Sequence, residues 1–314
     1  MTGLPRFLAL RALHLIPVVL GVTFLVFTML KLVPGDPAVA ILGIRATPDA
    51  LANLREALGL NKPFLAQYLS FLANLLRGNL GDSLVARQPV GQLVLERLPA
   101  TLSLVGLSAL LSAVLTIPPA FLAARHKDRP LDHAIRATFI VGLAIPSFWL
   151  GIILMLVFSL RLHLFPVSGF GATWPERLHH LVLPSFTVAL ALSAILIRNL
   201  RGGVLEVLRA DYVRTARAKG LAERAVMWRH VMRNALLSTI TIFGVNLAFL
   251  IGGTVVVETV FSLPGLGAML VTAVFQRDYP VVQGITLVFA FFIILVNLLV
   301  DLAYVALDPR VTFD

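Results

Sequence analysis

Six long runs without a charged side chain divide this chain, and they constrain its fold more than any other feature. They cover residues 12–30, 98–124, 137–160, 181–197, 234–257 and 279–300. A bilayer core of about 30 Å takes about 20 helical residues to cross. Only 13% of the 314 residues are charged, about half the share found in soluble domains. The sequence therefore predicts an all-α, polytopic membrane protein with six transmembrane helices.

The distribution of basic residues predicts the orientation of the chain in the membrane. Residues 198–233 carry nine Lys or Arg against three acids, whereas the loop around 161–181 carries only Arg161 and Arg177. Short loops rich in Lys and Arg stay in the cytoplasm. An even number of spans then places both termini there. The first apolar run is longer than a usual signal sequence, which favours an uncleaved span.

We expect three regions along the chain. Residues 1–31 form an N-terminal segment and the first span, 32–97 an extracytoplasmic helical loop, and 98–314 a five-helix core. In the loop, Thr47 and Pro48 predict a helix start, while Gly59 and Gly78 predict helix ends. Two or three short amphipathic helices on the outer face would pack over the span ends or dock an external partner.

A charged block at residues 211–235 lies between two of the apolar runs. Residues 206–219 predict one helix and 222–234 a second, with Gly220 as a left-handed residue between them. Ala222 supplies no side-chain cap to the second helix. Two spans tether this block, which disfavours DNA binding. It would lie on anionic lipid or in a groove of another protein.

The stretch Arg214-Thr-Ala-Arg-Ala-Lys-Gly220 resembles the "EAA" coupling loop of ABC-importer permeases. It keeps the second alanine and the glycine and lacks the glutamate, as the dipeptide, oligopeptide and nickel branch does. Further stretches resemble the same branch: Leu32-Val-Pro-Gly-Asp-Pro37, Gly78-Asn-Leu-Gly-Asp-Ser83, Leu98-Pro-Ala-Thr-Leu102, Ile145-Pro-Ser-Phe-Trp149, Phe261-Ser-Leu-Pro-Gly-Leu-Gly267, Arg277-Asp-Tyr-Pro-Val-Val-Gln283 and Asp308-Pro-Arg310.

This resemblance implies a type I ABC-importer permease fold and the first of two permease subunits in a bacterial inner membrane. It implies a second homologous permease, two ATP-binding subunits that hold ATP-Mg, and an extracytoplasmic substrate-binding protein. The chain would form half of a pathway for di- or oligopeptides, without a cofactor of its own and without a nucleic-acid partner. The implied coupling residues are Glu206, Asp211, Arg214, Thr215, Ala216, Lys219, Gly220, Glu223 and Arg229.

Polar residues inside the apolar runs are candidates for the pathway, because such groups tend to face a membrane protein's interior. They are Ser147, Asn246, Thr254, Glu258 and Asn297. Hydrogen bonding between helices is the alternative role. Residues 261–267 predict a tight external turn that could gate the outer mouth. Asp301 suits a structural ion pair better than a proton relay.

Several function classes are disfavoured. The sequence has no Gly-x-x-x-x-Gly-Lys-Ser/Thr loop, so ATP hydrolysis would belong to a partner. It has no cysteine, and its seven histidines are scattered, which argues against a dedicated metal site. Nickel chelate or glutathione remain alternative cargoes. A self-contained secondary transporter is the alternative of a different class, but it would need intramembrane charge relays or inverted repeats, and neither is evident. No catalytic motif predicts an enzyme.

Overall fold

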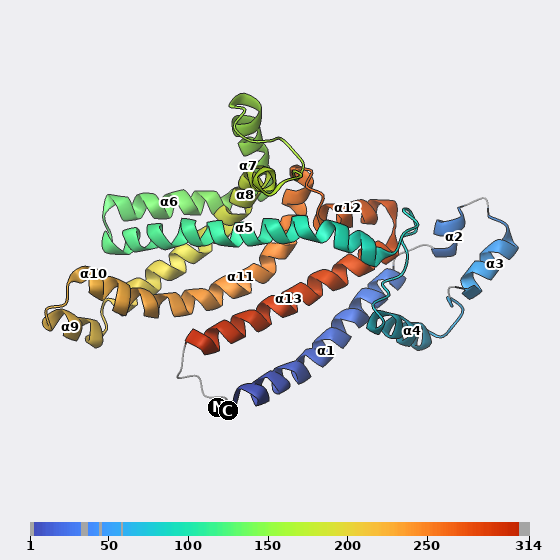
Figure 1. The fold of residues 1–314 in the computed structure, drawn as a ribbon, viewed down its shortest axis with the longest axis horizontal. Helices are drawn as coiled ribbons and strands as arrows, with labels where there is room; N and C mark the ends of the chain where they lie inside the picture. The colour runs from blue at the N-terminus through green and yellow to red at the C-terminus, as the bar shows by residue number, and fades with distance from the viewer. Residues whose placement is uncertain (1–2, 33–36, 44–45, 58, 308–314) are drawn as a thin grey trace. The chain divides into compact units, whose positions relative to one another are not determined.

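The computed structural model describes residues 3–32, 37–43, 46–57 and 59–307, which are helical nearly throughout (Figure 1). The helices are α1 (Gly3–Leu32), α2 (Pro37–Leu42), α3 (Pro48–Ala57), α4 (Phe64–Leu76), α5 (Val90–Arg125), α6 (Pro130–Ala144), α7 (Ser147–Leu154), η1 (Met155–Arg161), α8 (Trp174–Val207), α9 (Asp211–Ala218), α10 (Glu223–Ala225), η2 (Val226–Met232), α11 (Arg233–Val260), α12 (Leu266–Gln276) and α13 (Tyr279–Leu307). An isolated bridge joins Asp82 to Pro89. The predicted all-α class is confirmed.

Three helices, α5, α8 and α13, are long and apolar enough to cross a bilayer unbroken. Two bent pairs, Pro130–Ala144 with Ser147–Arg161 and Thr239–Leu247 with Leu250–Val260, raise the number of candidate spans to five. In α1 the described apolar stretch is Leu15–Met29, shorter than a full crossing. All six predicted runs are helical, but the count of six spans remains a prediction.

The apolar run at 137–160 is not the continuous helix expected. Its two halves meet at an angle of 103°. Ile145 has extended backbone angles, φ −80° and ψ 125°. Pro146 explains this break, because its ring disfavours helical angles at the preceding residue and it offers no N–H to the helix.

The described residues form two compact units. Among these residues, unit 1 comprises those within 3–99 and 269–294, and unit 2 comprises those within 100–268 and 295–307. The helices α5, α12 and α13 each run from one unit into the other. Each unit has its own internal packing.

In unit 1, α4 packs on α1 through aromatic rings. Phe27 lies 5.4 Å from Phe64 and 5.5 Å from Phe71, centroid to centroid, and Phe24 lies 5.4 Å from Tyr68. The Tyr68 hydroxyl is 3.0 Å from the Leu20 carbonyl of α1 and 3.0 Å from the Thr23 hydroxyl. These contacts fix α4 along one side of α1.

The predicted ends of the short helices in unit 1 are confirmed. The Thr47 hydroxyl accepts a hydrogen bond from the Ala50 N–H at 3.3 Å at the start of α3. Gly59 and Gly78 follow α3 and α4 with φ of +66° and +76°, angles that glycine adopts without steric cost.

Asp278 joins two sequence-distant parts of unit 1. Its carboxylate accepts hydrogen bonds from the Ser83 hydroxyl and from the N–H groups of Leu84 (3.1 Å) and Val85 (3.3 Å). The side chain is buried. The loop after Gly78 is thereby tied to the residue that precedes α13.

Unit 2 is organised around α8, which packs against α6 and α11. Two-thirds of the residues in its most apolar 18-residue stretch are buried. This helix extends beyond the predicted run 181–197 at both ends. It starts at a capping box formed by Thr173 and Glu176, a start signal that was not among those predicted.

Residues 261–265 form a turn as expected, but α12 begins at Leu266, within the predicted stretch 261–267, and this helix was not predicted. The side chain of Asp301, the Asp308-Pro-Arg310 stretch and most of the Leu32 to Pro37 stretch lie outside the described residues.

Candidate functional site

The cytoplasmic block predicted from the sequence is a distinct segment of unit 2. After α8 ends at Val207, residues 208–210 break the helix and α9 begins at Asp211. The expected single helix over 206–219 is therefore wrong. Ala210 has extended angles, φ −67° and ψ 142°, so the chain changes direction there. The second predicted helix comprises α10 and η2 and continues without a gap into α11.

One face of this segment is buried against the end of α8. Val213 of α9 and Val226 and Val231 of the second helix are each fully buried. They share one hydrophobic cluster with Leu200 and Val204 of α8. The segment is thus seated on α8 and continuous with α11, so a displacement of it would be transmitted to both helices.

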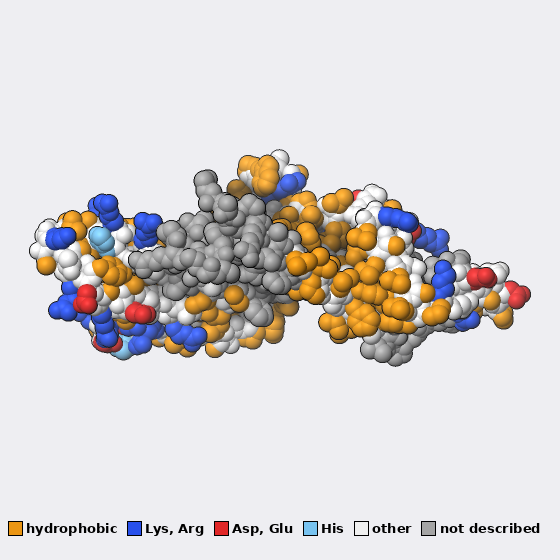
Figure 2. All heavy atoms as spheres, turned by 90° about the horizontal axis from the view of Figure 1, so that it is seen from below, with side chains coloured by type: hydrophobic (Ala, Val, Ile, Leu, Met, Phe, Trp, Pro, Cys, Tyr) orange, Lys and Arg blue, Asp and Glu red, His pale blue; other side chains and the backbone are white. Residues whose placement is uncertain are grey.

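The opposite face is charged and accessible. Eight of the nine predicted coupling residues are exposed: Glu206, Asp211, Arg214, Thr215, Lys219, Gly220, Glu223 and Arg229. Figure 2 shows Lys and Arg side chains gathered over this part of unit 2. Ala216 differs from the expectation of a docking contact, since it is 6% exposed and belongs to the buried cluster. On an amphipathic helix, inward-facing apolar residues such as this one pack the helix against its neighbour and leave the charged residues exposed.

Gly220 makes the turn between the two helices with φ +77°. Arg217 and Glu223 bracket it and form a two-point ion pair, with nitrogen–oxygen distances of 2.7 and 3.0 Å. Hydrogen bonding from Arg217 lowers the pKa of the Glu223 carboxyl below its usual value. Ala222 makes no side-chain cap, as expected. Arg217 was not among the predicted coupling residues. Its position three residues before Gly220, opposite Glu223 three residues after it, could have indicated an ion pair across the turn.

A buried ion pair lies between α6 and α8. Asp132 is fully buried and receives two hydrogen bonds from the Arg201 guanidinium, one of them Nε to Oδ1 at 2.7 Å. The Asp128 N–H also donates to it at 2.9 Å, and Arg136 lies 3.6 Å away. This pair ties α6 to the helix that carries the coupling segment. No sequence signal pairs two residues 69 positions apart.

The five pathway candidates lie on three helices: Ser147 on α7, Asn297 on α13, and Asn246, Thr254 and Glu258 on α11. Thr254 and Glu258 are fully buried within the chain, and Asn297 is exposed. Asn246 donates to the Ile242 carbonyl at 2.7 Å, and Thr254 to the Ile251 carbonyl at 2.7 Å. Their role in a pathway remains a prediction.

Glu258 holds together three segments of unit 2. Its carboxylate accepts a hydrogen bond from the Thr101 hydroxyl at 2.7 Å and from the Ala268 N–H at 3.0 Å. The Thr101 hydroxyl accepts in turn from the Leu266 N–H at 2.8 Å. A side-chain Cβ at Gly265 would overlap the carboxylate. The turn at 261–267 and the start of α12 are thus built around this one side chain.

Comparisons with known proteins cover almost the entire chain. Residues 116–313 match the family described as binding-protein-dependent transport system inner membrane component, and residues 4–105 match the N-terminal family of the same membrane components. The chain is 42% identical over 309 residues to an oligopeptide transport system permease protein of Bacillus subtilis, covering 96% of this chain and 98% of that one. It is 38% identical to a di/tripeptide transport system permease protein of Pseudomonas aeruginosa, covering 97% and 98%.

Solved structures support the expected fold. An inward-facing MetNI methionine ABC transporter matches with a TM-score of 0.58 at 15% identity, covering 69% of this chain and 97% of that one. An amino acid ABC transporter matches with a TM-score of 0.51, covering 70% and 94%. The type I importer permease fold is confirmed at this level. The chain is a multi-pass membrane subunit that belongs to the family of binding-protein-dependent transport system inner membrane components.

Proposed function

We propose that this chain is a permease subunit of an ABC importer for di- or oligopeptides and that residues 206–233 couple it to an ATP-binding partner. The cargo class rests on relatives named as oligopeptide and di/tripeptide permeases, which match over nearly their full length. A second permease, two ATP-binding subunits and an extracytoplasmic binding protein complete the importer. Both termini lie in the cytoplasm.

The observation that carries this proposal is the two-faced build of the coupling segment. Its buried face, including Val213 and Val226, seats it on α8, and its exposed face offers charges of both signs. A partner that grips the exposed face can therefore move α8 and α11 together, since neither can shift without the segment.

ATP binding would close the two partner subunits and bias the permease pair from an inward-open to an outward-open state. The closed, ATP-bound partner subunits would bind the outward-open permease pair more tightly than the inward-open pair. This difference in affinity supplies the energy for the change. The chain itself contributes the lever and half of the pathway, with Ser147, Asn246, Thr254, Glu258 and Asn297 as candidate lining groups.

The proposal is tested in vesicles that hold the purified importer with its binding protein. ATP-dependent uptake of a labelled dipeptide and tripeptide is measured, with a nickel chelate and glutathione as competing cargoes. Peptide uptake that requires the ATP-binding subunits is expected. Uptake without them would favour a secondary transporter, and preferential uptake of the chelate or glutathione would overturn the cargo class.

The coupling role is tested by Gly220→Val. A left-handed angle costs a β-branched residue about 1–2 kcal/mol, so the turn should reshape and uncouple ATP hydrolysis from uptake. Gly43→Val is a matched control, because Gly43 has a similar φ of +82° and a Cβ at either position would have no neighbouring atom within 4 Å. If both variants transport equally well, the segment does not couple the importer.

A further inference from the structure

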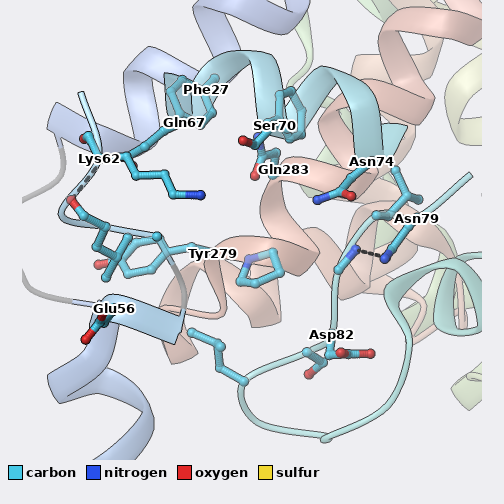
Figure 3. Close-up of a pocket in the computed structure, with 18 of the residues that line it drawn as sticks. Phe27, Glu56, Lys62, Gln67, Ser70, Asn74, Asn79, Asp82, Tyr279 and Gln283 are labelled. Atoms are coloured by element: carbon cyan, nitrogen blue, oxygen red, sulfur yellow. Dashed lines mark hydrogen bonds between the residues drawn. The ribbon is translucent and has the colours of Figure 1, made fainter. Parts of the chain in front are cut away.

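Unit 1 contains a cavity of about 970 Å³ that no predicted role explains (Figure 3). Its walls come from α3 and α4, from the loop at 79–87 and from the start of α13. Binding sites for small molecules typically measure about 300–1,000 Å³. The space is therefore large enough for a ligand of a few residues.

The helix α4 presents a polar stripe to this cavity. Gln67, Ser70 and Asn74 recur at helical spacing and line the space. Tyr68 and Phe71, on a neighbouring side of the helix, hold it on α1. The polar wall is thus fixed by packing.

The cavity carries charges of both signs in equal number. Lys62 and Arg87 line it, as do Glu56 and Asp82. Within the described part of the chain these four form no ion pair with one another. All four side chains are exposed, so a ligand that enters from the open side can reach them, and a ligand with one charge at each end would find a partner of opposite sign for both ends.

Hydrogen-bond donors converge on one side of the space. In Figure 3 the Lys62 ammonium and the Asn74 amide both point into the cavity.

We propose that this cavity binds short zwitterionic peptides by their ends. The terminal carboxylate meets Lys62 and Asn74, and the terminal ammonium meets Glu56 or Asp82. This inference rests on the proposed function for the cargo class. It adds a site on the chain's predicted extracytoplasmic part where cargo is held by features common to all short peptides.

The test measures direct binding of labelled tri-alanine to the purified importer without its binding protein, by equilibrium dialysis. Tri-alanine with a free carboxylate should bind more tightly than its C-terminal amide. Lys62→Ala should weaken binding of the free acid by roughly tenfold, the loss typical of one hydrogen bond to a charged group, and should abolish the preference over the amide.

Two further variants keep the test decisive. Asn74→Asp preserves the size of the side chain and adds a negative charge, so it should also weaken binding of the free acid. Arg77→Ala removes an exposed cation at the end of α4 that does not line the cavity, and it should change nothing.

Equal affinity for acid and amide in the unmodified importer would overturn the inference, as would equal effects of Lys62→Ala and Arg77→Ala. A loss of affinity for the binding protein alone, with peptide binding unchanged, would instead identify a docking surface and also overturn it. If vesicles still take up peptides in these cases, only this inference fails. If they take up none, the proposed function fails as well.

Discussion

Gly265 should tolerate no side chain, because the Glu258 carboxylate occupies the position that its Cβ would take. A Cβ there would overlap the carboxylate carbon and both of its oxygens. The φ of Gly265 is not in the left-handed region, so backbone strain plays no part. The reason for glycine here is close approach alone.

The expected cost of Gly265→Ala follows from these contacts. Overpacking a filled site costs about 1–3 kcal/mol. If the carboxylate moves away instead, the Thr101 hydroxyl and the Ala268 N–H lose their acceptor, at about 1–3 kcal/mol. The matched control is Gly253→Ala in α11, where nothing lies within 4 Å, and alanine should stabilise the helix by about 0.5–1 kcal/mol.

The free energy of unfolding is measured on the purified chain by reversible denaturation in mixed detergent micelles, followed by tryptophan fluorescence. Glu258→Ala is destabilising by itself, but in that background Gly265→Ala should cost less than about 0.5 kcal/mol, because the clash is gone. The reasoning would be refuted if the Gly265→Ala variant were as stable as the Gly253→Ala variant. It would also be refuted if Gly265→Ala cost as much in the Glu258→Ala background as in the unmodified chain.

Three further changes test other contacts. Arg201→Met leaves Asp132 buried without its main partner and should lower the free energy of unfolding by about 3 kcal/mol. The double variant with Asp132→Leu should recover most of that loss. If the losses from the two single substitutions simply add in the double variant, the ion pair is contradicted. Tyr68→Phe keeps the rings and removes the hydroxyl bond to α1, which should cost about 1 kcal/mol in the same assay; a cost of zero would mean that the bond is not made. The pKa of Glu223 lies below its usual value, so its ion pair should contribute fully above about pH 4.5 and be lost as the pH falls further; ¹³C NMR of the carboxyl should show this titration moving upward in Arg217→Ala, and no movement would argue against the pair.

Local features of the sequence predicted much of the fold. The apolar runs located the long helices, because burial in a membrane demands continuous apolar surface. Gly59, Gly78 and Gly220 were each expected to end or separate helices, and all three have positive φ. These signals depend on neighbouring residues only.

Other features had weaker local signals and were missed or misjudged. The run at 137–160 was predicted as one span although it contains Pro146. The apolar stretch at 266–276 is short and follows a predicted turn, so its helix was not predicted. The break at 208–210 contains neither glycine nor proline. The bend at Ile145 follows from Pro146 itself. The break at 208–210 has no such local cause and lies where the segment packs on the end of α8, so tertiary packing overrides local propensity there.

The sequence by itself determined the class of the protein, its helical segments and a charged block suited to a partner. It also contained Ser83, Thr101 and Asp278 in separate stretches that resemble the family, and Glu258 as a pathway candidate. Only the tertiary structure joined them, Ser83 to Asp278 and Thr101 to Glu258. The reason is physical: a buried carboxylate needs donors, and chain folding alone decides which of many distant donors reaches it.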